Sequence, residues 1–308
     1  MAGIGSGDGV VSDSYAKART RLLSPAWFVL LVFMLAPLVI MLVYSFLTKE
    51  FRGGVIWEFS IASYDQFFFD RGLFGDEPPR IEWTYIVIFL RSIAQALVAT
   101  ALCLLIGFPT AYFIATRPPS KRMAWLFLIT VPYWVNLLIR TVSMKFLIRD
   151  NGPLNEALLA VGLIDTPLSL INTNLAVQLG LFYSYLPFMV LPVYASIERY
   201  DFSLSQAAAD LYASRFDILF RIVIPAVKPG IVAGCILVFV PSLGAFLAPD
   251  LLGGAKNFMI GSLIEEQFKG NAGNWPFGAA VSMILLTIVL LVLLGFARSQ
   301  RPRGVRAR

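Results

Sequence analysis

The chain has 308 residues, of which 58% are hydrophobic and 14% charged, and its formal net charge is +6. A soluble domain of this length would carry far more charged surface. Several apolar blocks reach the roughly 20 residues that a helix needs to cross a bilayer. The composition therefore predicts a polytopic helical membrane protein embedded in lipid. Because the basic residues cluster at membrane flanks, the positive charge gives no reason to expect a nucleic-acid partner.

Six apolar blocks predict six transmembrane helices, over residues 26–47, 84–115, 123–139, 175–197, 231–252 and 276–297. Proline interrupts several of them: Pro132 breaks the third, Pro241 breaks the fifth and Pro249 ends it. The predicted membrane domain covers residues 22–298. Residues 1–21 are rich in glycine and serine and predict a disordered tail, and residues 299–308 predict a short basic tail.

The loop charges predict the orientation, because lysine and arginine are retained in the cytoplasm. The 116–122 turn and the segment after Ala297 hold basic residues and no acidic ones, whereas segment 48–83 holds four basic and seven acidic residues. We therefore expect both termini and loop 198–230 to be cytoplasmic. The aromatic-rich external segments 48–83 and 253–275 predict short helices packed over the mouth of the bundle.

Loop 198–230 predicts a helix–turn–helix. Ser203 and Ser214 each precede a polar residue by three positions, which is the pattern of a helix N-terminus. The second short helix is expected to run over 215–224 and to stop at Pro225. An alanine face over 207–209 favours docking against a partner protein. The alternative is an amphipathic helix lying on the lipid surface, but the mixed charge of the loop favours a protein partner.

Several kinds of chemistry are missing from the sequence. There is no histidine and no GxxxxGK[ST] phosphate-binding loop. Carboxylates are nearly absent from the spans, with Glu198 and Asp250 at span ends. The chain therefore lacks the ionisable groups that an ion-driven carrier normally places in the middle of the membrane. Cys103 and Cys235 lie in apolar blocks and predict no disulfide. The chain is thus expected to depend on an energised partner. A membrane-embedded enzyme such as a lipid transferase is disfavoured, while a self-sufficient channel or secondary carrier stays open.

Candidate pathway residues fall on faces of the broken spans. Aromatic faces with a carboxylate suit a flexible organic cation through cation–π and charge attraction. Gln178 and Met189 share the face of the fourth span. The candidates on the third, fourth and fifth spans are Trp134, Asn136, Phe182, Tyr185, Phe239, Ser242, Phe246 and Asp250. The alternative is that the aromatic residues only pack the bundle. Arg91, Arg140 and Lys145 are expected to be interfacial anchors or loop contacts.

Residues 206–225, QAAADLYASRFDILFRIVIP, resemble the EAA loop of the permease subunits of bacterial ABC importers, EAA-x3-G-x9-I-x-LP. The alanines at 207 and 208, Ile222 and Pro225 match the motif. Gln206 replaces the usual glutamate, Ile224 replaces leucine, and Tyr212 stands where glycine is typical. From about residue 22 to 298 the chain resembles the spermidine/putrescine-type permeases of the PotB/PotH branch. Phosphonate, opine and iron-chelate importers have similar relatives.

This resemblance implies a type I ABC importer permease fold and a heterodimer with a second permease subunit. It also implies two cytoplasmic ATPases that bind ATP and Mg, and an external substrate-binding protein. The chain itself would be non-catalytic and would bind no cofactor or metal. The 203–214 helix would couple to an ATPase through Ser205, Gln206, Ala207, Ala208, Asp210, Leu211, Tyr212, Ser214 and Arg215. Tyr212 would alter the turn, fill an ATPase groove or pack beneath the loop.

Overall fold

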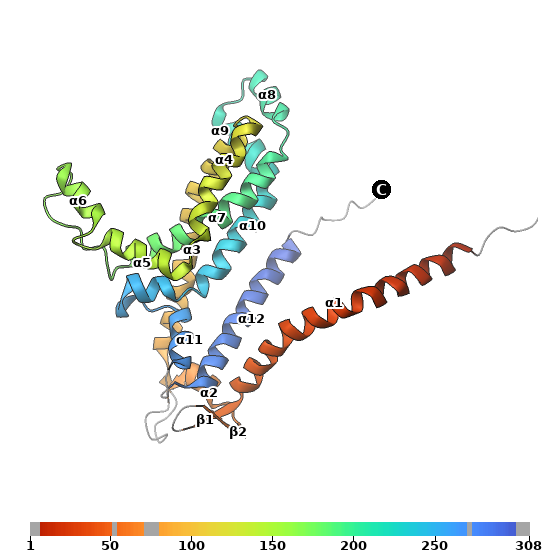
Figure 1. Cartoon of the computed structure of the whole chain (residues 1–308), viewed down its shortest axis with the longest axis vertical. Helices are drawn as coiled ribbons and strands as arrows, with labels where there is room; N and C mark the ends of the chain where they lie inside the picture. Colours follow the sequence, from red (N-terminus) through yellow and green to blue (C-terminus); the bar gives the residue numbers. More distant parts are fainter. Residues whose placement is uncertain (1–6, 51–53, 71–79, 270–272, 300–308) are drawn as a thin grey trace, which may run out of the picture.

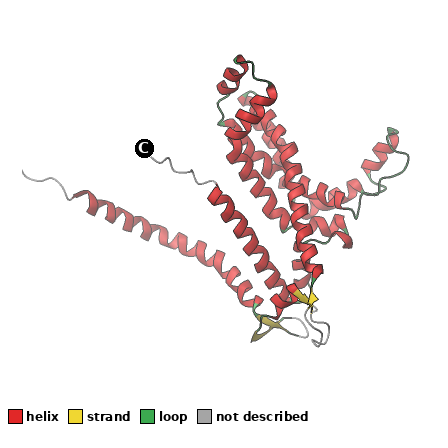
Figure 2. Ribbon diagram, turned by 180° about the vertical axis from the view of Figure 1, so that it is seen from behind, coloured by secondary structure: helices red, strands yellow, loops and turns green. Residues whose placement is uncertain are grey.

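The computed structural model describes residues 7–50, 54–70, 80–269 and 273–299 and is mostly helical (Figures 1 and 2). The long helices are α1 (Gly7–Ser45), α3 (Trp83–Ala115), α7 (Asn174–Glu198), α10 (Ile224–Leu243) and α12 (Trp275–Ser299). The shorter helices are α2 (Ala62–Phe68), α4 (Pro119–Thr130), α5 (Leu137–Ile148), α6 (Pro153–Ala160), α8 (Ser203–Asp210), α9 (Arg215–Ile218) and α11 (Ile260–Phe268). The strands are β1 (Leu47–Lys49), β2 (Val55–Phe59), β3 (Phe69–Asp70) and β4 (Arg80–Ile81), and four short turns are η1 (Val131–Trp134), η2 (Leu219–Val223), η3 (Pro249–Gly253) and η4 (Ala255–Asn257).

Within the described residues, five helical segments are long and apolar enough to cross a membrane, and a bent pair of helices can form a sixth span. The five are Leu23–Ser45, Trp83–Ala115, Asn174–Glu198, Arg215–Leu243 and Trp275–Phe296. The bent pair, Pro119–Trp134 and Leu137–Ala160, turns by 94°. The predicted break near Pro132 is confirmed, but residues 123–139 do not form one straight helix. Val135 and Asn136 are extended between the two helices, and the Asn136 side chain accepts from Leu138 N–H at 2.8 Å.

The fifth span differs from the prediction at both ends. It begins at Arg215 and ends at Leu243, whereas residues 231–252 were expected. Pro225 was expected to stop a separate short helix, and this prediction is wrong, because the helix continues through the π-helical turn η2 into α10. A π turn changes the hydrogen-bonding register, which accommodates a proline that lacks an N–H and crowds the preceding turn. Pro241 lies inside α10, two residues before its end.

Helix α1 begins at Gly7, so most of the 1–21 segment that was predicted to be a disordered tail is helical. No glycine or proline occurs between Val10 and Ser24, and alanine, lysine and arginine in this stretch favour helix. The helix diverges from the bundle and packs mainly against α12 (Figures 1 and 2). Its apolar side chains from Leu23 onward are exposed around the helix, as suits a helix surrounded by lipid or by another chain. Residues 300–308, most of the predicted basic tail, lie outside the described part of the chain.

The centre of the bundle is formed by α3, α7 and α10, which pack against one another around Met189. Glycines allow this close approach. A Cβ added at Gly107 of α3 would lie 2.9 Å from Met189 Cγ, and one at Gly234 of α10 would lie 2.7 Å from Met189 Sδ. The three helix backbones therefore meet where the sequence supplies residues without side chains.

One end of the bundle carries α2, α11 and the hairpins, and the other carries α8 and α9 (Figure 1). Phe67 of α2 packs with Ile260 of α11 and Phe277 of α12 in a buried cluster. The expected short helices are thus present over this end. The two antiparallel hairpins, β1–β2 and β3–β4, were not predicted, because an all-α chain was expected and these strands are only two to five residues long.

A valine at Gly230 should destabilise the bundle. A Cβ there would meet Ser196 Cβ and lie 2.7 Å from the Pro192 carbonyl oxygen, so α10 would have to move away from α7. We expect Gly230→Val to reduce the free energy of unfolding by about 2 kcal/mol or more, measured by thermal unfolding of the purified protein. The matched control is Gly295→Val, since nothing lies within 4 Å of that position. Equal midpoints for both variants would contradict the packing.

Candidate coupling loop and translocation pathway

Helix α8 ends in a Schellman motif that explains why the EAA pattern favours glycine at position 212. The N–H of Ala213 donates to the Ala208 carbonyl at 3.1 Å, and the N–H of Tyr212 donates to the Ala209 carbonyl at 2.9 Å. Tyr212 is in the left-handed conformation with φ 60°. The turn is therefore retained with tyrosine in place of glycine, at a cost of about 1 kcal/mol in backbone energy.

The two predicted caps have different outcomes. The Ser214 hydroxyl accepts from Asp217 N–H at 3.1 Å and donates to the Asp217 carboxylate at 2.6 Å, so this cap is confirmed. Ser203 makes no capping bond. The side chain of Asp201 accepts from Ser203 N–H instead, at 2.9 Å. This bond holds the pKa of the Asp201 carboxyl below its ordinary value, because the N–H stabilises the ionised form.

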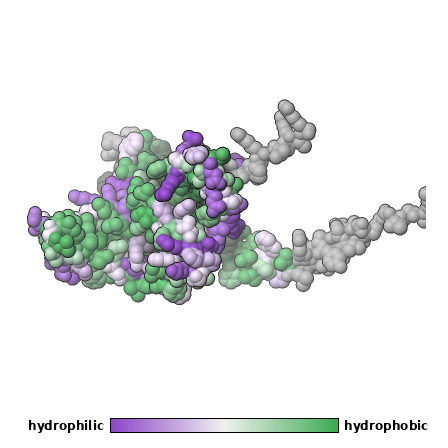
Figure 3. All heavy atoms as spheres, turned by 90° about the horizontal axis from the view of Figure 1, so that it is seen from above, coloured by the Kyte–Doolittle hydropathy of each residue, from purple (hydrophilic) through white to green (hydrophobic). Residues whose placement is uncertain are grey.

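The loop presents large apolar side chains at its tip. Leu211 is 81% exposed, Tyr212 97% and Phe216 75%, so the interpretation that Tyr212 packs beneath the loop is wrong. Hydrophilic and apolar side chains lie side by side at this end of the molecule (Figure 3). Among the predicted coupling residues, Gln206, Ala207, Asp210, Ser214 and Arg215 are also exposed, while Ser205 and Ala208 are half-buried. Phe216 was missed, although it follows Tyr212 by four residues.

The loop is joined rigidly to the bundle. The hydroxyls of Ser205 and Tyr200 are hydrogen-bonded at 2.7 Å, and the Phe202 ring packs against Tyr112 of α3 with centroids 6.4 Å apart. Val223 of η2 is buried in the main core. A displacement of α8 would therefore be passed to α3 and α10 through packed side chains.

Among the predicted pathway residues, Tyr185 and Phe246 line one cavity, of about 100 Å³, between α5, α7 and the end of α10. The Tyr185 hydroxyl donates to the Pro241 carbonyl at 3.3 Å. Ser242, the next residue, is fully buried, and its hydroxyl has no hydrogen-bond partner among the described residues. Residues from three spans thus meet at this junction cavity.

The other candidates from the third and fifth spans lie elsewhere. Trp134 is 75% exposed and packs edge-on against Phe127 at 5.7 Å. Asn136 uses its side chain to cap α5. Phe239 is half-buried on α10 and lines none of the cavities described here. The predicted helical faces therefore do not converge on one site.

Asp250 lies in a separate acidic pocket of about 290 Å³ that also contains Phe258, Glu265, Glu266 and Lys269. Lys269 Nζ lies 2.6 Å from Glu265 Oε1, and this contact raises the pKa of the Lys269 amine above its ordinary value. Three carboxylates against one ammonium give the pocket a negative balance. Sequence reasoning found Asp250 alone, because α11 brings the two glutamates beside it from 15 and 16 residues further along the chain.

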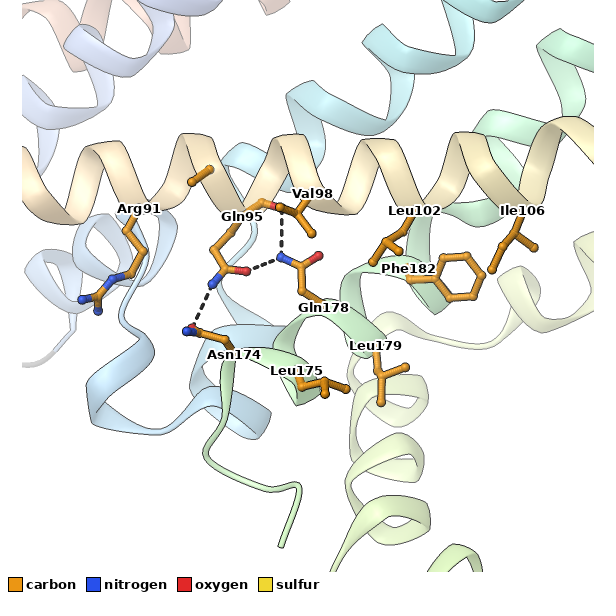
Figure 4. A pocket seen from close by; sticks show the side chains of 11 residues that line it. Arg91, Gln95, Val98, Leu102, Ile106, Asn174, Leu175, Gln178, Leu179 and Phe182 are labelled. Carbon is orange, nitrogen blue, oxygen red and sulfur yellow. Dashed lines mark hydrogen bonds between the residues drawn. The ribbon is translucent and has the colours of Figure 1, made fainter. Parts of the chain in front are cut away.

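Phe182 lines a larger groove of about 650 Å³ between α3 and α7, called the α3–α7 groove below (Figure 4). Most of its walls are apolar. A cluster of amides lies toward one end, where Gln95 Nε2 donates to Asn174 Oδ1 at 2.9 Å and Gln178 Nε2 donates to the Gln95 carbonyl at 3.0 Å. Arg91 stands beyond them and donates to the Lys256 carbonyl. This contact ties α3 to η4, and the role of Arg91 as an interfacial anchor stays a prediction.

Arg140 is buried, with 5% of its surface exposed, so the prediction that it anchors to lipid headgroups is wrong. Its guanidinium donates to the carbonyls of Ser184 at 3.4 Å and Val135 at 3.5 Å and lies 4.9 Å from the centre of the Tyr133 ring. Its Nε has no partner within the described residues. Lys145 is exposed, as expected for an anchor.

Solved transporter structures share this fold. A bacterial ABC transporter involved in the import of the acidic polysaccharide alginate aligns with a TM-score of 0.63 at 17% identity, covering 96% of this chain and 99% of that one. An inward-facing MetNI methionine ABC transporter aligns with a TM-score of 0.52, also at 17% identity, covering 70% of this chain and 94% of that one. The chain therefore has the type I ABC importer permease fold.

The chain belongs to the family described as binding-protein-dependent transport system inner membrane component, which matches residues 104–303. It is a multi-pass inner-membrane transport subunit and not an enzyme. It is similar to the spermidine/putrescine transport system permease protein PotB of Escherichia coli K12, with 42% identity over 275 residues, 89% of this chain and 94% of that protein. PotB of Haemophilus influenzae is 36% identical over 292 residues, covering 95% of this chain and 96% of that protein.

Replacing Arg140 by methionine should not destabilise the protein. A buried guanidinium without a carboxylate loses more in desolvation than two long hydrogen bonds return. We expect Arg140→Met to leave the unfolding free energy unchanged or raise it by about 1 kcal/mol, whereas Arg140→Ala should lower it because a cavity remains. Thermal unfolding of the purified complex measures both, with Lys145→Met as the exposed control. A clear loss of stability in Arg140→Met would contradict this reasoning.

Proposed function

We propose that this chain is the permease subunit of an ATP-driven importer for a polyamine such as spermidine or putrescine. The observation that carries the proposal is the similarity to PotB over 89% of the chain, in a fold shared with ABC importers. In this proposal the chain forms half of the translocation pathway, and both of its termini and its 198–230 loop are cytoplasmic. In this proposal the segments before residue 22 and after residue 298 lie on the cytoplasmic side of the permease domain.

The proposed partners are a second permease subunit in a heterodimer, two cytoplasmic ATPases that bind ATP and Mg, and an external substrate-binding protein. One solved relative of this fold is an alginate ABC transporter in complex with an alginate pentasaccharide-bound periplasmic protein. The present chain lacks histidine and has no phosphate-binding loop, which supports a motor on separate subunits.

The proposed ATPase contact is the exposed part of α8 with its Schellman turn. Exposed apolar residues such as Leu211, Tyr212 and Phe216 are favourable only when a partner covers them. The surrounding Gln206, Asp210 and Arg215 supply a polar rim. Closure of the ATPases would move this segment and, through η2, the α10 helix.

For the pathway we propose two parts. The acidic pocket around Asp250 attracts the cationic substrate at the outer end of the pathway. Its carboxylates line a concave site, which strengthens their negative potential there. The junction cavity lined by Tyr185 and Phe246, next to the buried Ser242, opens during transport, when α5 and α10 separate. Trp134, Asn136, Phe182 and Phe239 remain candidate pathway residues on the faces of these helices.

The function is tested by uptake into proteoliposomes containing the whole importer. We expect ATP-dependent uptake of spermidine and putrescine, and none of a phosphonate, an opine or a ferric chelate. Uptake by this chain alone in a sealed bilayer would show a self-sufficient carrier and would overturn the proposal. Transport of one of the other solutes instead would reassign the substrate and leave the importer class standing.

Tyr212→Asp should uncouple ATP hydrolysis from uptake. Aspartate tolerates the left-handed backbone, so the turn is kept while a charge enters an apolar contact. We expect uptake to fall roughly tenfold or more, measured together with ATP hydrolysis in proteoliposomes. Tyr212→Phe keeps the ring and should transport normally. Normal uptake by Tyr212→Asp would count against docking through this residue.

Asp250→Asn should weaken the electrostatic attraction of the substrate. We expect the rate of spermidine uptake at low substrate concentration to fall about two- to fivefold at low ionic strength. The difference from wild type should shrink at high salt, because salt screens exposed charges. The control is Asp165→Asn, an exposed carboxylate outside the acidic pocket. If Asp250→Asn and wild type behave alike at low salt, the attraction by this pocket is refuted.

A further inference from the structure

The α3–α7 groove contains a buried hydrogen-bond acceptor that lacks a partner. Gln178 Oε1 is inaccessible to solvent and has no hydrogen bond within the described residues. Such an acceptor is costly inside an apolar environment unless a donor reaches it. The groove beside it has a volume of about 650 Å³, which is ample for a flexible small molecule.

The orientation of the Gln178 amide is determined by its neighbours. The Gln178 nitrogen faces the backbone carbonyl of Gln95 at 3.0 Å and also the Gln95 Oε1 atom. A backbone carbonyl can only accept, so the nitrogen must lie on that side and the oxygen on the other. In Figure 4 the oxygen points along the groove toward the part lined by Val98 and Leu102. The unpaired group is therefore an acceptor, and its missing partner is a donor.

One turn further along α7, Phe182 presents its ring to the same groove (Figure 4). Residues four apart lie on one face of a helix, about 6 Å from each other. An amide oxygen next to an aromatic ring is a favourable pair for an alkylammonium group. The ammonium donates a hydrogen bond to the oxygen, and the face of the ring attracts its positive charge. The aliphatic side chains that line the rest of the groove, such as Leu102, Ile106 and Leu179, suit methylene segments.

We propose that the α3–α7 groove is a binding subsite for the protonated, flexible chain of a polyamine, with Gln178 Oε1 and the Phe182 ring holding one ammonium group. This inference rests on the proposed function and assigns the substrate to a site. The apolar walls of the groove would contact the methylene segments beside this ammonium group.

The charge of Arg91 determines which end of the groove an ammonium group would prefer. Arg91 stands at the end of the groove beyond Gln95, with its guanidinium turned to the Lys256 carbonyl. Seven residues of α3, a rise of about 10 Å, separate Arg91 from Val98. Its positive charge repels a bound ammonium and favours binding at the Phe182 end. An anionic lipid headgroup would be attracted by Arg91 instead, so the two occupants predict opposite effects of removing this charge.

The test is equilibrium binding of radiolabelled spermidine to the assembled permease–ATPase complex in nanodiscs without the binding protein. We expect Gln178→Leu to raise the Kd about tenfold, because a hydrogen bond to a charged group is lost. Phe182→Leu should raise the Kd about threefold. Arg91→Gln should lower it about twofold, and Arg91→Lys, which keeps the charge, should leave it unchanged. Leu191→Met, an apolar change on α7 outside the groove, is the matched control.

Two results would overturn this inference. An unchanged Kd in Gln178→Leu, with lower thermal stability, would show that the amides only clamp α3 to α7. Weaker binding in Arg91→Gln that matches the loss of copurified anionic phospholipid would show that a lipid occupies the groove. Both leave the proposed function intact if wild-type complex transports spermidine. Failure of the wild-type importer to bind or transport any polyamine would instead refute the proposed function itself.

Discussion

The close contact of α7 with α10 is the constraint on which the rest of the structure depends. Met189 of α7 is fully buried against Gly234 of α10 and Gly107 of α3, and larger residues at those glycines would force the helices apart. Between lipid-exposed helices no hydrophobic effect drives association, so close packing must supply the attraction. The same three helices carry the α8–α9 loop at one end and border the junction cavity and the α3–α7 groove along their length. A movement at the loop is therefore transmitted as a change in helix packing.

The α8–α9 loop combines a rigid base with an exposed tip. Its base is tied to the bundle through Tyr200, Phe202 and Val223, whereas Leu211 and Tyr212 project outward. The Schellman turn explains the apparent departure of this chain from the EAA pattern, because tyrosine adopts the backbone conformation that glycine usually supplies. The substitution places a large ring at the most exposed point of the loop, where it enlarges the apolar contact available to a partner.

Much of the fold could be predicted from local features of the sequence. Hydropathy located the apolar segments, and the Ser214 cap followed from a spacing of three residues. The Ser203 cap was wrong because the helix begins one residue earlier, with Phe202 at its N-cap, and Asp201 accepts from Ser203 N–H. The helix through Pro225 was missed because proline was expected to end the helix. The π turn η2, which accommodates the proline, was not foreseen. These errors concern neighbours in the chain, where two local rules compete.

The site was less predictable because its contacts join residues far apart in sequence. Gln95 and Gln178 are 83 positions apart, and Arg140 reaches a carbonyl 44 positions away. Periodicity placed Phe182 and Tyr185 on one face of α7, yet they border different cavities. Which of two neighbouring faces meets a cavity depends on the tilt of α3 and α10, which no pattern within α7 specifies.

The uninterrupted segment Arg215–Leu243 has a mechanical consequence. Its 29 residues form a rod about 43 Å long that joins the loop to the junction cavity. The π turn near one end would be the pivot of such a rod, because its hydrogen-bond register is already displaced. A rotation of about 10° at that pivot would sweep the distal tip through about 5 Å, given the roughly 30 Å between them. A small movement of the α8–α9 loop would thus displace the far end of α10 by about the width of an alkylammonium chain.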